Sequence, residues 1–231
     1  LDSTNEFAPF GILDDDVMDK PVLLTATGEI SRTPKTNPNN DYAVVKTKIK
    51  LQSNGSVQGS SVAEMHGSIE SSSRATQFGY ENRDQEEIVN GLLERFQERG
   101  EGSFKTGDPK DLDSPWQVFS KFELNPVVNV PGPSAMTVPV GIAPGYLREI
   151  SSWTVPKSRK FPASCRSVRY VEQTELEFPH QLIVQRIPKS VNFKSGALQY
   201  QSSYSLKGNT LTINRLYSSN RPTSSCDASD D

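Results

Sequence analysis

The candidates for a catalytic nucleophile and its base in this sequence are Cys165, Cys226, His66 and His180. A catalytic cysteine needs a base that takes its proton and a third group that orients that base. Nothing in the sequence pairs these four residues in this way, and their spacing fits none of the compact ligand pairs of a zinc site. We interpret His66 as a strand-end residue and His180 as a surface turn residue. A self-contained cysteine hydrolase using Cys165 and His180 is therefore the least favoured function.

The two cysteines do not make a disulfide framework. Cys226 lies in a polar tail, PTSSCDASDD, which we expect to be frayed. We therefore favour free thiols over a Cys165–Cys226 bridge, and the redox state of the compartment stays open.

An acidic cluster near the start of the chain is the other group of side chains that could bind a ligand. A calcium loop needs alternating oxygen ligands around a central glycine, and this cluster lacks both, so we interpret it as a solvated loop. Gly100 and Gly102 follow a predicted helix instead of opening one, so they do not form a phosphate-binding loop. We predict no metal and no cofactor. The acidic residues are Asp14, Asp15, Asp16 and Asp19.

The composition argues against two classes of partner. The 25 basic and 28 acidic residues give a net charge of -3, whereas nucleic-acid binding needs a clustered basic excess. No stretch approaches the roughly 20 apolar residues of a membrane-spanning helix. Hydrophobic residues make up 34% of the chain and occur in short runs along its whole length, which indicates a folded domain with a polar surface.

Short strands predominate among the elements that must position these residues. Between residues 43 and 51, apolar side chains and Thr47 alternate with lysines and Val44, which is typical of a half-buried strand. Asn54-Gly55 then supplies the backbone conformation of a tight hairpin, and Val57 begins the return strand. Further strands are predicted at residues 22–30, 116–124, 166–177, 181–187, 198–206 and 211–216.

One helix is predicted after Asn82, which can form a capping box with Gln85, and Gly100 ends it. A shorter helix within residues 68–78 is compatible with the pattern, although the serine run there disfavours it. The fold class is therefore mainly β: an antiparallel β-sandwich with one or two helices. The apolar face of the first helix carries Ile88, Leu92, Leu93 and Phe96.

Two stretches near the N-terminus, LDSTNEFAPFGIL and KPVLLTATGEISRTP, resemble a segment that closes the catalytic core of bacterial transglutaminase-like proteins. Proteins of this group carry an N-terminal β-sandwich, a papain-like core and a C-terminal β domain of unknown function. Downstream, the strand–Asn-Gly–strand unit, the helix ending in Gly100 and LKGNTLTINR also resemble the C-terminal domain of the family. The resemblance implies that residues 1–40 are the end of the core with its connector, and that residues 41–231 are a β-sandwich domain.

The resemblance also implies a role for Asp2. In the family, an Asp-x-Thr motif supplies the acidic member of a Cys-His-Asp triad, and the motif here is Asp2-Ser3-Thr4. Asp2 would orient a catalytic imidazole only where a cysteine and a histidine lie upstream, and none precedes it in this chain. We therefore expect an excised, non-catalytic C-terminal portion of a protein whose intact form is a cysteine acyltransferase or amidase.

The expected role of this portion is to support the catalytic core or to bind a partner. The implied partner is the upstream core of the same protein, or else another protein, and the family favours a periplasmic or cell-envelope location. The alternative is an autonomous carbohydrate- or protein-binding module with a stacking platform of Trp116, Trp153, Tyr146 and Tyr170. Exposed aromatic faces would favour that module, whereas an apolar surface around residues 1–30 would favour a severed core.

Overall fold

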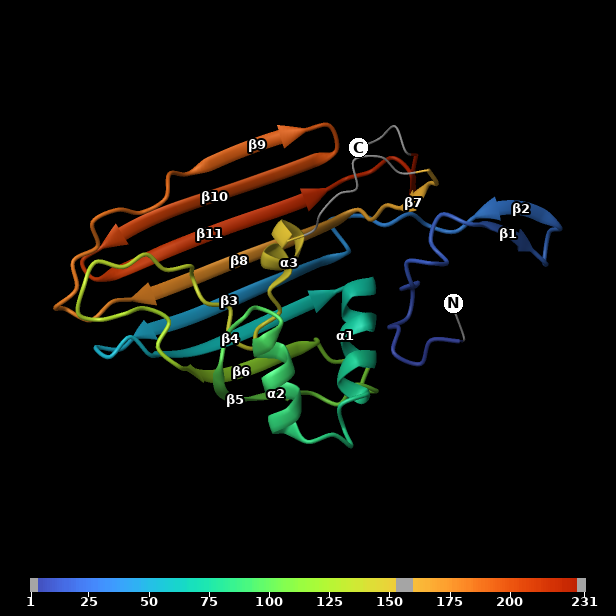
Figure 1. Cartoon of the computed structure of the whole chain (residues 1–231). Coiled ribbons are helices and arrows are strands. Elements are labelled where there is room, and N and C mark those ends of the chain that lie inside the picture. The colour runs from blue at the N-terminus through green and yellow to red at the C-terminus, as the bar shows by residue number, and fades with distance from the viewer. Residues whose placement is uncertain (1–3, 153–159, 228–231) are drawn as a thin grey trace.

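The computed structural model describes residues 4–152 and 160–227. Eight strands form one sheet in the order β5-β6-β4-β3-β8-β11-β10-β9, and the predicted mainly β class is confirmed (Figure 1). Its neighbouring strands pair antiparallel except β3 and β8, which are parallel. The strands are β3 (Tyr42–Leu51), β4 (Val57–His66), β5 (Gly100–Thr106), β6 (Gln117–Leu124), β8 (Val168–Glu177), β9 (Val191–Ser195), β10 (Leu198–Lys207) and β11 (Thr210–Ser219).

Two small sheets lie at the end of the main sheet where β3 begins. The hairpin of β1 (Pro21–Leu24) and β2 (Glu29–Arg32) extends away from the main sheet (Figure 1). The second small sheet pairs β7 (Ala163–Ser164) with β12 (Ser225–Cys226). The single strand predicted at residues 22–30 is therefore wrong, because Gly28, with a φ of 73°, turns the chain back after β1.

The β3–β4 hairpin confirms the clearest prediction from the sequence. The residues of β3 alternate between the interior and solvent in the expected phase, so that Thr47 is buried between exposed Lys46 and Lys48. Gly55 has a φ of 85°, and a Cβ atom at this position would collide with the carbonyl group of Val128. The turn therefore needs glycine both for its backbone conformation and for the loop packed against it.

Three helices cover one face of the sheet (Figure 1): α1 (Ser68–Phe78), α2 (Gln85–Glu94) and α3 (Tyr146–Ser152). The core between them forms two clusters, and the partly buried Phe104 packs against both. The cluster under α2 includes Val89, Leu93, Phe122, Leu176 and Ile213. The cluster beside α1 includes Ala43, Met65, Ile69, Trp116 and Val118.

Helix α1 forms in spite of its serine run, and two of its serines donate hydrogen bonds to neighbouring carboxylates. The backbone N–H and the hydroxyl of Ser68 both donate to Asp41 Oδ1, at 2.9 and 3.0 Å. The hydroxyl of Ser71 donates to Asp14 Oδ1 at 3.1 Å. A serine that bonds to a partner outside the helix no longer competes with the helical backbone.

Helix α2 is confirmed, but both of its predicted ends are wrong. Asp84 is the N-cap, and its side chain accepts the backbone N–H of Glu86 at 3.1 Å, so the capping box of Asn82 and Gln85 does not form. The helix ends at Glu94, and Gly100 begins β5 instead of ending the helix. The apolar face is confirmed, since Ile88, Leu93 and Phe96 are buried and Leu92 is partly buried.

The strand predicted at residues 181–187 is also wrong. This segment has no strand partner, although its apolar side chains Leu182, Val184 and Ile187 pack against the core cluster under α2. Ile183 points into solvent between them. The alternation therefore reflects a loop lying against the core, and a strand that the sequence did not reveal, β9, follows it.

Candidate interaction surface

The cysteines form a disulfide between Cys165 and Cys226, so the favoured prediction of free thiols is wrong. The C-terminal segment folds back beside β7 because the backbone N–H of Cys165 donates to the carbonyl of Ser224 at 2.9 Å, and Cys226 is buried. In this structure Cys165 has no thiol, and the hydrolase that would use Cys165 and His180 does not form.

The two histidines occupy the positions that the sequence predicted. His66 is the last residue of β4; its ring stacks on Tyr42 with the centroids 4.3 Å apart, and its Nε2 lies 2.8 Å from Glu64 Oε1. This contact lowers the pKa of Glu64. His180 is exposed in a turn after Phe178. Because both cysteines are in the disulfide, the described structure pairs neither histidine with a thiol.

The acidic cluster ties the N-terminal segment to the rest of the chain. Asp14 accepts hydrogen bonds from Asn5 and Ser71, and Asp15 Oδ2 lies 2.5 Å from Arg166. Asp16 is exposed, but Asp15 is partly buried and Asp19 is buried, so the prediction of a solvated loop is wrong for these two. In the described part of the chain, no group of three or more His, Cys, Asp or Glu side chains is placed to hold a metal ion.

The three described residues of the predicted aromatic platform do not form an exposed platform. Trp116 is 1% exposed, and its Nε1 donates to Ser73 Oγ at 2.9 Å. Tyr146 and Tyr170 stack on each other, with centroids 4.6 Å apart and planes at 10°. Trp153 and Asp2 both lie outside the described residues.

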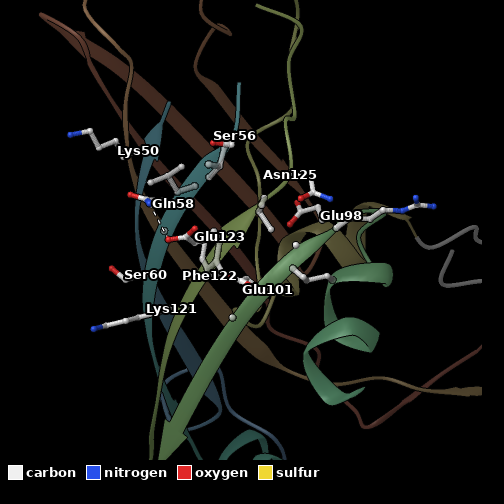
Figure 2. A pocket seen from close by; sticks show the side chains of 18 of the residues that line it. Lys50, Ser56, Gln58, Ser60, Glu98, Glu101, Lys121, Phe122, Glu123 and Asn125 are labelled. Carbon is white, nitrogen blue, oxygen red and sulfur yellow. Dashed lines mark hydrogen bonds between the residues drawn. The ribbon is translucent and has the colours of Figure 1, made fainter. Parts of the chain in front are cut away.

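The sheet face turned away from the helices, which bears Lys46, Lys48 and Lys50, is the polar face. A groove of about 1720 Å³ runs over it across β6, β4 and β3 and continues to α2 at the edge of the sheet. Lys50, Ser60 and Lys121 point to one side of these strands (Figure 2). Two contacts join strands on this face: Lys50 Nζ lies 3.6 Å from Glu177 Oε1, and the Gln58 amide donates to Glu123 at 3.0 Å.

At the sheet edge, the same groove borders Glu98, which accepts backbone N–H groups from Val140 and Gly141. Burial raises the pKa of Glu98. Glu98 therefore anchors the loop before α3. The solvent-exposed face of β3 that the lysine alternation predicted is confirmed. Neither feature places a nucleophile beside a base.

The hairpin of residues 21–32, which we call the apolar hairpin, exposes side chains that soluble domains usually cover. Leu23 lies opposite Ile30 in the register of β1 and β2, and these residues are 60% and 81% exposed. Leu24 on the adjacent position is also exposed, and Phe10, upstream of the hairpin, is 87% exposed. The single strand predicted over VLLTATGEI does not reveal this hairpin; Thr27-Gly28 is the signal for its turn.

The base of the apolar hairpin is fixed to the C-terminal segment. Arg32 Nε donates to Asp19 Oδ1 at 2.9 Å, and Asp19 Oδ2 accepts the backbone N–H of Ser224 at 3.2 Å. The Ser224 N–H and then the Arg32 guanidinium lower the pKa of Asp19. Lys35 Nζ also donates to the carbonyl of Pro222 at 2.6 Å. The disulfide holds the C-terminal segment in place, and this segment in turn fixes the base of the hairpin. The hairpin tip projects from that base.

Comparison of this chain with family models, with curated proteins and with solved structures found no match. Among the described helices, none has the length and apolar character needed to cross a membrane.

Proposed function

We propose that this chain is the non-catalytic C-terminal portion of a transglutaminase-like protein and that its apolar hairpin packs against the catalytic core of that protein. The proposal rests on the sequence resemblance of residues 1–34. The single structural observation that carries it further is the exposed pair of Leu23 and Ile30 within that same stretch.

The energetics of a two-stranded hairpin favour a partner for this surface. An isolated hairpin is marginally stable in water, and β1–β2 pairs with no other strand in the described structure. Fully burying a Leu or Ile side chain contributes about 1.5–3 kcal/mol, so covering Leu23 and Ile30 would stabilise the hairpin substantially. A catalytic core that ends in this hairpin would provide that cover.

The role proposed for Asp2 is to orient a histidine of that core. A carboxylate on the far nitrogen of a catalytic imidazole selects its tautomer and holds its orientation. The chain by itself would then be inactive, and the domain that follows the hairpin would support the core or bind a partner.

The test is to mix this chain with the separately purified segment that precedes it in the longer gene product, and to measure co-elution and amide hydrolysis or amine transfer. We expect a complex with activity, which Asp2→Ala abolishes without preventing complex formation. Leu23→Glu with Ile30→Glu should prevent the complex, whereas Ile183→Glu, at another exposed isoleucine, should not. Absence of any complex between the native segments would refute the proposal.

The alternative proposal, an autonomous carbohydrate- or protein-binding module, has less support. Its platform would need exposed aromatic faces, and Trp116 is enclosed by Ser73 and by Arg74, whose guanidinium lies 4.7 Å from the ring centroid. Binding of a soluble glycan by the isolated chain would favour this alternative.

A further inference from the structure

A second cavity, distinct from the groove on the polar face, lies between α1, α2 and α3 on the helix-covered face of the sheet. Its volume is about 260 Å³, just below the roughly 300–1,000 Å³ of sites for drug-sized ligands, so a molecule with one ring suits it. It occurs where the two core clusters fail to merge, and Phe104, which packs against both clusters, lines it. Exposed Ser72 and Thr76 on α1 border it, so the cavity opens to solvent.

The walls of this cavity are apolar and aromatic. Two aromatic pairs line it: Tyr146 stacks on Tyr170, and Tyr80 lies at 57° to Phe104 with the centroids 6.2 Å apart. Aromatic walls of this kind bind flat apolar groups by stacking and edge contacts. The aliphatic part of the lining consists of Met65, Ile69, Leu92, Val118, Ile142 and Ala143.

The polar groups of the cavity include several hydrogen-bond donors. Neither the Tyr146 nor the Tyr170 hydroxyl makes a hydrogen bond within the described part of the chain. Burial raises the pKa of both residues, so both hydroxyls stay protonated and can donate. Arg95, Arg166 and Glu149 also belong to the described lining, and the two guanidinium groups add further hydrogen-bond donors.

The two arginines are held in place by other side chains. Arg95 forms an ion pair with Glu149 between α2 and α3. Arg166 bonds to Asp15 and, at 3.2 Å, to the hydroxyl of Ser68, while its buried Nε has no hydrogen-bond partner in the described structure. A cation with an unused donor beside two donating hydroxyls is suited to a carboxylate.

We propose that this cavity binds a small aromatic carboxylate, with its ring against the aromatic and aliphatic walls and its carboxylate toward Tyr146, Tyr170 and Arg166. The bound carboxylate gives the two hydroxyls the acceptor that they lack. The ring fills the space between the two core clusters. This site is independent of the apolar hairpin and of the proposed catalytic core.

The test titrates the complete chain with 3-phenylpropionate at neutral pH and follows saturation-transfer NMR and amide chemical shifts. We expect saturable binding, with shifts at residues of α1 and α3. The uncharged 3-phenylpropionamide should bind at least about tenfold more weakly, because a hydrogen bond to a charged group is lost. Hexanoate, which has no ring, should also bind more weakly. Equal affinity for the acid and its amide would overturn the proposal, and so would the absence of saturable binding at millimolar concentrations.

Two pairs of variants place the ligand. Tyr146→Phe removes one hydroxyl but keeps the stacked ring, and should weaken binding of the acid about tenfold while leaving the amide nearly unchanged. Thr76→Trp puts a large ring at the mouth of the cavity and should abolish binding. Ala75→Trp, at an exposed neighbouring position of α1 that does not line the cavity, should preserve it. Binding that survives Thr76→Trp as well as Ala75→Trp would show that the ligand sits elsewhere.

Discussion

The carboxylate of Glu98 accepts the backbone N–H of Gly141 at 2.7 Å, and its other oxygen accepts the N–H of Val140 at 2.9 Å. This contact joins the segment after α2 to the loop that precedes α3. Glu98→Gln should lower the free energy of unfolding by about 1–3 kcal/mol, because an amide NH₂ would face a buried N–H donor. Urea denaturation measures the change. Glu94→Gln, at an exposed position of α2, is the matched control and should stay within about 0.5 kcal/mol of wild type.

Asp19 predicts a pH dependence of stability. Its pKa is lowered in the folded state by the Ser224 N–H and Arg32, so its contribution is present above the unfolded pKa and disappears as the pH falls through the folded pKa. Asp19→Asn should therefore lower the urea midpoint at pH 7 and change it much less at pH 2.5. Asp16→Asn, at an exposed position, should leave both midpoints unchanged. An equal effect of Asp19→Asn at both pH values would contradict this account.

Removing the disulfide should destabilise the protein. The bridge closes a loop with a sequence separation of 61 residues, and disulfides typically contribute about 2–4 kcal/mol by restricting the unfolded chain. Replacing Cys165 and Cys226 together by serine should lower the free energy of unfolding by this amount. The same variant should increase hydrogen exchange at the Ser224 amide, because the C-terminal segment that bonds to Asp19 is released. Labelling of both cysteines by iodoacetamide in the native, unreduced protein would show that the bridge is absent.

Arg74 should be the most sensitive single position of α1. Its side chain is 1% exposed and bonds to Glu70 at 2.8 Å. It also donates to the backbone carbonyl groups of Pro109, Asp111 and Ser114. Arg74→Met removes the partner of a largely buried carboxylate, so we expect a loss of about 3–5 kcal/mol in thermal or urea unfolding. Arg83→Met breaks a surface ion pair with Glu87, at the same spacing of four residues, and should cost at most about 1 kcal/mol. Similar costs for the two variants would argue against the buried network.

Local patterns predicted the elements whose side chains repeat with the period of a strand or a helix. The alternation along residues 43–51 identified β3 and its polar face, because successive side chains of a strand point to opposite sides. Ile88 and Leu93 identified the buried side of α2, because their spacing follows the period of a helix. The pattern failed at residues 181–187, where alternating apolar side chains pack against the core without any hydrogen-bonded neighbour strand. Periodicity records which side is buried, and says nothing of the partner.

The candidate surfaces were predicted only in part. An apolar surface near residues 1–30 is expected for a severed catalytic core and not for an autonomous binding module. The exposed side chains of Leu23 and Ile30 form such a surface. The cavity between the helices had no signal in the sequence. Tyr146 and Tyr170 were noted as aromatic residues, but their stacking depends on α3 lying over β8, and this packing joins distant parts of the chain.

The sequence by itself determined the mainly β class, the β3–β4 hairpin and the apolar side of α2, because these follow from the chemistry of neighbouring residues. The tertiary structure alone decided that β3 pairs in parallel with β8 and that Cys165 bridges to Cys226. It also decided that the apolar hairpin projects from the sheet. Such features depend on contacts between segments far apart in the chain, and each requires the rest of the fold to bring those segments together before it can form.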